Sequence, residues 1–79
     1  MNQVRIIVEA KLKTENEWTE IEVAVNKSQA ERLIARRMDI LKRSDERYSH
    51  KADKNMEGVT NVLYNNRLQR IYRVRETNV

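Results

Sequence analysis

Apolar and polar residues alternate near the start of the chain, and this pattern constrains the fold more than any other feature. Every second residue from position 4 to position 12 is apolar, as in a strand with one buried face: Val4, Ile6, Val8, Ala10 and Leu12. A similar repeat follows at Ile21, Val23 and Val25, and four polar residues at 14–17 suit a hairpin loop. We therefore expect a hairpin over residues 3–26, in the register that pairs Leu12 with Thr19, Ala10 with Ile21, Val8 with Val23 and Ile6 with Val25.

A helix is predicted over residues 28–43. Ser28 and Glu31 have the spacing of a capping box, which would make them the helix cap. Beyond the cap, apolar residues recur on one side of a helix: Ala30, Leu33, Ile34, Met38 and Leu41. The polar pair Ser44 and Asp45 interrupts this side, which favours a break there. The helix either ends at this point or resumes as a helical extension over residues 46–57, and an unbroken helix would project beyond the sheet.

Residues 59–76 are predicted to form a second hairpin with its turn at Asn65 and Asn66, because asparagine tolerates the positive φ angles of a two-residue turn. The expected fold class is α+β with the order ββ-α(α)-ββ. Two hairpins would form a four-stranded antiparallel sheet, with one long or broken helix packed on one face. With no proline and one glycine, residues 1–79 read as a single domain without a linker.

The composition argues against most kinds of catalytic site. The chain has no cysteine and one histidine, so we expect no disulfide, no metal site and no cofactor. A single glycine rules out a glycine-rich phosphate loop. We expect a non-catalytic protein, and a metal-independent nuclease is the enzymatic alternative. No apolar run approaches the ~20 residues of a membrane span, and the N-terminal segment alternates, unlike a signal peptide. We therefore expect an intracellular, cytoplasmic protein without a membrane contact.

Arginine is concentrated near the C-terminus. The chain carries 16 basic and 12 acidic residues, and its positions 58–79 contain four arginines, no lysine and one acidic residue. Strict alternation through the second hairpin would direct Arg67, Arg73 and Arg75 to the outer face with Tyr64, and Trp18 of the first hairpin would join them. A second basic stripe is expected on the outer side of the helix, formed by Arg32, Arg36 and Arg43.

Two further arginines are expected to have structural roles. Alternation directs Arg70 toward the helix, where Asn61 or Asp45 could be its partner, because an unpaired buried charge is costly. Arg37 falls within the apolar side of the helix, where it would extend its charged end to solvent or pair with Asp45.

An outer face of arginine, tyrosine and tryptophan is consistent with two functions. Aromatic rings that stack on bases beside arginines that contact phosphates would bind RNA or DNA. The same residue types are enriched where proteins bind proteins, so a small regulator, inhibitor or assembly factor is the alternative. A homodimer through the sheet face or through a projecting helix is a third arrangement consistent with the sequence.

Overall fold

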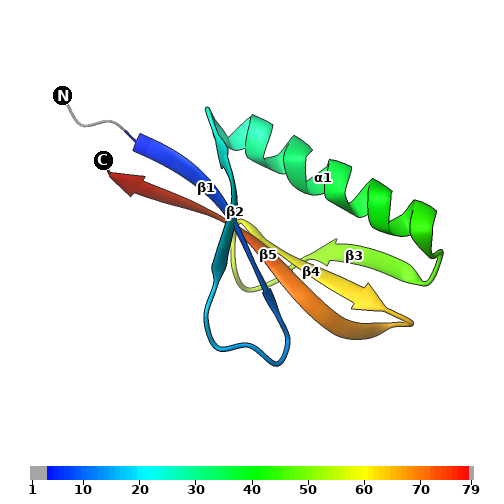
Figure 1. The fold of residues 1–79 in the computed structure, drawn as a ribbon. Coiled ribbons are helices and arrows are strands. Elements are labelled where there is room, and N and C mark those ends of the chain that lie inside the picture. Colours follow the sequence, from blue (N-terminus) through cyan, green and yellow to red (C-terminus); the bar gives the residue numbers. More distant parts are fainter. Residues whose placement is uncertain (1–3, 79) are drawn as a thin grey trace.

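Five antiparallel strands form one sheet in the computed structural model, which describes residues 4–78 (Figure 1). The strands are β1 (Val4–Leu12), β2 (Thr19–Ala24), β3 (Tyr48–Ala52), β4 (Val59–Tyr64) and β5 (Arg67–Asn78). Their order across the sheet is β2-β1-β5-β4-β3, so the long strand β5 lies in the centre and pairs with both β1 and β4. The two hairpins predicted from alternation are therefore joined through β1 and β5.

One helix, α1 (Lys27–Ser44), covers one face of this sheet. Its start differs from the prediction, because the N-terminal cap is Asn26 and not Ser28 with Glu31. The Asn26 side chain accepts a hydrogen bond from the Gln29 amide (2.8 Å), and Gln29 Oε1 accepts one from the Val25 amide (2.8 Å). The reciprocal capping pattern thus exists two residues earlier in the sequence than expected.

The main core lies between α1 and the sheet. Met38, Val8 and Val62 are the largest fully buried side chains, and they come from the helix, β1 and β4. Eight buried residues form this cluster: Ile6, Val8, Ala24, Ala30, Ile34, Met38, Val62 and Tyr72. Each Å² of apolar surface that is buried stabilises the fold by roughly 25 cal/mol. Packing of this helix face against the facing strand residues therefore holds α1 on the sheet.

The predicted four-stranded sheet and the helical extension over 46–57 are both wrong, because residues 48–52 form the fifth strand. The helix ends at Ser44, with Asp45 as its C-terminal cap, so the predicted break at this pair is confirmed. The turn from β3 to β4 is organised by Asp53, whose Oδ1 accepts hydrogen bonds from the Asn55 and Met56 amides (2.9 and 3.1 Å).

The predicted register of the first hairpin is wrong: Ala10 lies opposite Thr19 and not Ile21, and Ile6 lies opposite Ala24 and not Val25. Each hairpin also contains an irregularity. In the first hairpin Val8 lies opposite Glu22 while Glu9 lies opposite Glu20, so one extra residue is accommodated in β2. In the second, Val62 lies opposite Arg70 while Leu63 lies opposite Leu68. Each extra residue reverses the side-chain alternation of one strand relative to its partner.

As a result, the residues of β4 face the side opposite to the one that alternation without a bulge predicts. Val62 is buried in the core, although alternation without a bulge directs it outward. Val59, Asn61 and Leu63, which alternation without a bulge would direct toward the helix, alternate with Val62 along β4 and so face away from the helix. The turn itself is as predicted, because Asn65 and Asn66 both have positive φ (55° and 66°).

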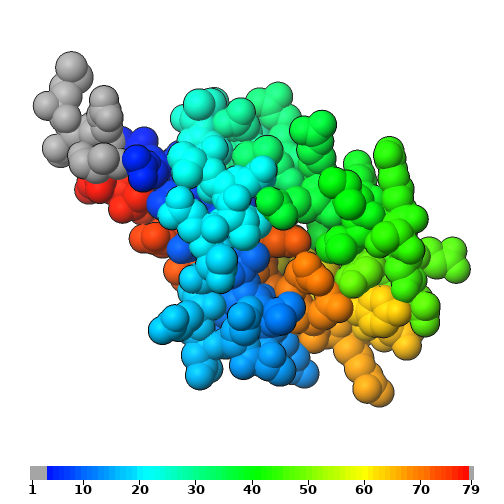
Figure 2. All heavy atoms as spheres, viewed as in Figure 1, coloured from blue at the N-terminus to red at the C-terminus, as the bar shows by residue number. Residues whose placement is uncertain are grey.

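The molecule is elongated, with principal extents of 46 × 25 × 21 Å. The start of β1 and the end of β5 extend together past the helix (Figure 1). In the same view, part of the central strand β5 is visible between the atoms of β1–β2 and those of α1 (Figure 2). Among residues 4–78, no helix combines the length and apolar character needed to cross a membrane.

Candidate binding surface on the open sheet face

The sheet face opposite α1 is not covered by any helix or strand of the described residues (Figure 1). We call it the open face. The strand register places these side chains on it: Arg5, Ile7, Glu9, Lys11, Glu20, Val23, Ser49, Lys51, Val59, Asn61, Ile71, Arg73, Arg75 and Thr77. Five of them are cations and two are carboxylates, so the face is positively charged. Of the predicted recognition residues, it brings together Arg73 and Arg75, with Trp18 beside them.

Glu9 is the residue that organises this face. It is only 6% exposed and lies directly opposite Arg73 on the neighbouring strand β5. Its Oε1 accepts hydrogen bonds from Nε of Arg73 (2.8 Å) and Nε of Arg75 (2.9 Å), and its Oε2 accepts one from Nη2 of Arg75 (3.4 Å). Burial alone would raise the pKa of Glu9, but the hydrogen bonds and charges of Arg75 and Arg73 outweigh it and hold this pKa below its usual value.

Trp18 extends this cluster from the loop that precedes β2. The guanidinium carbon of Arg73 lies 4.2 Å from the centre of the indole ring, and Nζ of Lys11 lies 5.1 Å from it. Both distances are those of cation–π contacts. The indole is partly exposed, so an ordered aromatic ring lies beside two cations on the open face. We call Glu9, Lys11, Trp18, Arg73 and Arg75 the open-face cluster.

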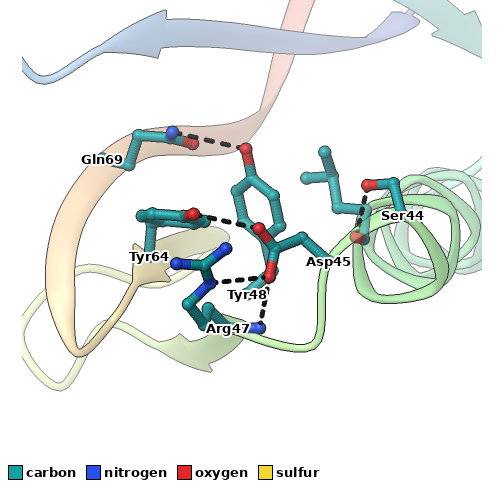
Figure 3. Close-up of polar contacts among 7 residues, drawn as sticks. Ser44, Asp45, Arg47, Tyr48, Tyr64 and Gln69 are labelled. Atoms are coloured by element: carbon teal, nitrogen blue, oxygen red, sulfur yellow. Dashed lines mark hydrogen bonds and ion pairs between the residues drawn. The ribbon is translucent and has the colours of Figure 1, made fainter.

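Tyr64 does not contribute to the open face, in contrast to the prediction. Its hydroxyl donates a hydrogen bond to Oδ2 of Asp45 (2.9 Å), and Asp45 Oδ1 accepts one from Nε of Arg47 (3.0 Å), at the C-terminal end of α1 (Figure 3). The ring also meets Tyr48 edge to face, with 4.9 Å between ring centres. The extra residue in β5 explains this position. It reverses the alternation between the turn and the later part of β5, so Tyr64 lies on the helix side while Arg73 and Arg75 lie on the open face.

The hydrogen bonds between Asp45, Arg47 and Tyr64 shift the pKa values of Asp45 and Tyr64. Hydrogen bonds from the Arg47 side chain and amide, and then from Tyr64, lower the pKa of Asp45 to about 2. The hydrogen bond to Asp45, together with burial, raises the pKa of Tyr64. Gln69 Nε2 donates to the Tyr48 hydroxyl (3.4 Å), which links β5 to the same group (Figure 3). These side chains therefore fasten the end of α1 to β3, β4 and β5.

The remaining predicted cations lie apart from the open-face cluster. Arg67 is exposed and follows the turn between β4 and β5. Arg32, Arg36 and Arg43 are exposed on α1, which packs against the opposite face of the sheet. Within residues 4–78, none of these four arginines forms an ion pair. The predicted recognition set is thus distributed over separate parts of the surface.

The structural partners predicted for Arg37, Arg70 and Asn61 are not the observed ones. Nε of Arg37 lies 3.6 Å from a carboxylate oxygen of Glu22, an ion-pair contact too long for a hydrogen bond. Nε of Arg70 donates to Oε1 of its neighbour Gln69 (3.0 Å). Asn61 donates to Asp53 (3.0 Å). Asp45, the partner expected for Arg37 or Arg70, is bonded to Arg47 and Tyr64 instead.

Sequence reasoning missed the central role of Glu9. A glutamate among alternating strand residues is normally a solvated side chain, and only the pairing of β1 with β5 brings the two arginines to it. Within the described residues, no three His, Cys, Asp or Glu side chains gather closely enough to hold a metal ion. Comparison of the chain with protein-family models, curated proteins and solved structures finds no match.

Proposed function

We propose that this protein is a non-catalytic binding module and that its open face contacts single-stranded RNA or DNA. The observation that carries the proposal is the position of Trp18, held beside Arg73 and Lys11 on an uncovered, positively charged sheet face. An exposed aromatic ring can stack on any base, and nearby cations can neutralise the phosphates on either side.

The bond to Glu9 supports this function and does not compete with it. Arg73 donates its Nε to the carboxylate, and a guanidinium has five N–H donors, so its outer N–H groups stay available for a phosphate oxygen. Because the side chain is already held in place, less rotamer freedom is lost when a ligand binds. The carboxylate neutralises only one of the two arginines that it orders.

Trp18 is the only tryptophan of the chain, so its fluorescence reports directly on the proposed site. Titration with a mixed-sequence single-stranded oligonucleotide should quench this fluorescence, and the affinity should fall steeply as salt is added. Oligonucleotide binding that leaves the fluorescence unchanged would place the contact elsewhere on the protein. Absence of binding at low salt would contradict the proposal.

A protein partner is the second candidate, and the edge strand β2 favours it. Val23 on the open face is 53% exposed, and Val25 directly after β2 is 81% exposed. Exposed apolar side chains and a tryptophan on one surface are typical of a protein interface. For this function, Trp18→Ala and Val23→Ser would weaken partner binding most, and the affinity would depend little on salt.

A further inference from the structure

A groove lies on the helix side of the sheet, away from the open face. It has a volume of about 450 Å³ and lies between the first half of α1, the end of β3, the start of β4 and part of β5. Its apolar walls come from Ile34, Ala35, Ala52 and Val74. This volume is in the range of sites that bind a small molecule or an inserted side chain.

The rim of the groove is acidic, although the protein as a whole is basic. Glu31, Glu57 and Glu76 line it, together with Lys27 and the single histidine, His50. Lys27 forms an ion pair with Glu76 (3.1 Å). Glu31 and Glu57 have no ion-pair partner within residues 4–78. The charge of the groove is therefore complementary to a cation with an apolar stem.

Strand β3 borders the groove and has a free edge, because it is the last strand of the sheet (Figure 1). The direction of its backbone groups follows from two bonds with the β4 side: the Asn65 amide donates to the Arg47 carbonyl (3.0 Å), and the Asp53 amide donates to the Val59 carbonyl (2.9 Å). Because backbone direction alternates along an antiparallel strand, the N–H and C=O groups of His50 and Ala52 point away from β4.

The groove and the free edge of β3 meet at the same two residues. His50 and Ala52 direct their backbone groups to the free edge, and both line the groove. A chain that paired with this edge would place alternate side chains on the same face as these two residues, at the mouth of the groove. Backbone hydrogen bonds would hold such a segment, and the groove would select its side chain.

We propose that the free edge of β3 binds an extended segment of a partner polypeptide by strand addition, and that a lysine or arginine of this segment enters the groove beside Glu31 and Glu57. The apolar walls suit the methylene stem of such a side chain, and the two carboxylates suit its charged end. The site is independent of the open face, because it lies on the other side of the sheet.

The test uses the intact chain and the peptide acetyl-Val-Thr-Lys-Thr-Val-amide, followed by amide chemical shifts in NMR. Its two valines and its lysine alternate with threonine, so they share the face directed at the groove. Shifts should concentrate at His50, Ala52 and Gly58. Shifts confined to the open face, or no shift at millimolar peptide, would overturn the proposal.

Two pairs of matched controls separate strand addition from general charge attraction. We expect antiparallel addition, as in the rest of this sheet, and in that orientation each peptide residue that faces the groove directs its N–H toward β3. N-methylation of the lysine should therefore abolish binding, while N-methylation of a threonine should preserve it. The double variant Glu31→Gln with Glu57→Gln should weaken binding about tenfold, whereas Glu46→Gln in the connection after α1 should not change it. Equal binding of the two methylated peptides, or equal effects of the acidic variants, would contradict the proposal.

Discussion

Glu9 and Arg73 lie directly opposite each other on β1 and β5, and a hydrogen bond of 2.8 Å joins their side chains. The pair connects the two hairpins across the face that the helix does not cover. It also fixes Arg73 against Trp18. A single buried carboxylate therefore contributes both to the pairing of the central strands and to the order of the proposed binding surface.

Replacement of Glu9 by glutamine should destabilise the protein. The variant keeps the shape of the side chain but removes the charge that two guanidinium groups contact, and we expect the free energy of unfolding to fall by about 1–3 kcal/mol. Urea denaturation near neutral pH measures this difference. Glu20→Gln is the matched control, because this glutamate is exposed on the same face, and it should change stability by less than about 0.5 kcal/mol. Equal effects of the two variants would contradict the structural role of Glu9.

Asp45 should make stability depend on pH in the acidic range. Its pKa is about 2 in the folded protein, against an ordinary value of 3.8. A lowered pKa contributes stability that is fully present above the ordinary value and is lost as the pH falls through the folded value. Asp45→Asn should therefore be less stable than the parent near pH 6, and the difference should disappear between about pH 4 and pH 2. A difference that does not change over this range would contradict the hydrogen bonds of Asp45.

Tyr64 should matter for stability and not for nucleic-acid binding. Tyr64→Phe removes the hydroxyl that donates to Asp45 but keeps the ring against Tyr48. We expect a lower melting temperature and an unchanged affinity for a single-stranded oligonucleotide. Loss of affinity in a variant that remains folded would return Tyr64 to the set of recognition residues.

The bulge in the second hairpin can be tested through Val62. This residue is completely buried, although simple alternation from the asparagine turn directs it outward. Val62→Thr introduces a buried hydroxyl and should lower the free energy of unfolding by about 1–3 kcal/mol. Val23→Thr, at a residue that is 53% exposed, should stay within about 0.5 kcal/mol of the parent. A larger loss of stability in Val23→Thr than in Val62→Thr would support a second hairpin without a bulge.

Features that depend on neighbouring residues could be predicted from the sequence. The limits of α1 differ by one residue at each end from the predicted 28–43, because its apolar repeat and the polar pair Ser44–Asp45 are local signals. The turn at Asn65–Asn66 depends on a local backbone preference and was equally predictable. The N-terminal cap was predicted at the wrong residue, because two pairs have the capping spacing: Asn26 with Gln29, and Ser28 with Glu31.

Features that depend on distant partners could not be predicted. Tyr48–Ala52 has no apolar alternation, and it forms a strand because β4 offers it an edge. The bulges each add one residue, and nothing in the local pattern marks which one. The contact of Glu9 with Arg73 and Arg75 requires the order in which the two hairpins join. These are the features that determine which arginines reach the open face.

The most direct test of the proposed function compares two variants that lose the same number of charges from opposite sides of the protein. One replaces open-face cations by glutamine, at Arg5, Lys11 and Lys51. The other replaces exposed helix cations by glutamine, at Arg32, Arg36 and Arg43. Neither variant removes a hydrogen-bond partner of Glu9, so both should remain folded, as circular dichroism would verify.

Affinity for a single-stranded oligonucleotide is then measured for both variants over a range of salt concentrations. If the open face binds nucleic acid, the open-face variant should lose about tenfold to a hundredfold in affinity and show a shallower salt dependence, while the helix variant should lose less than about threefold. Equal losses, or a larger loss in the helix variant, would contradict the assignment of the binding site to the open face.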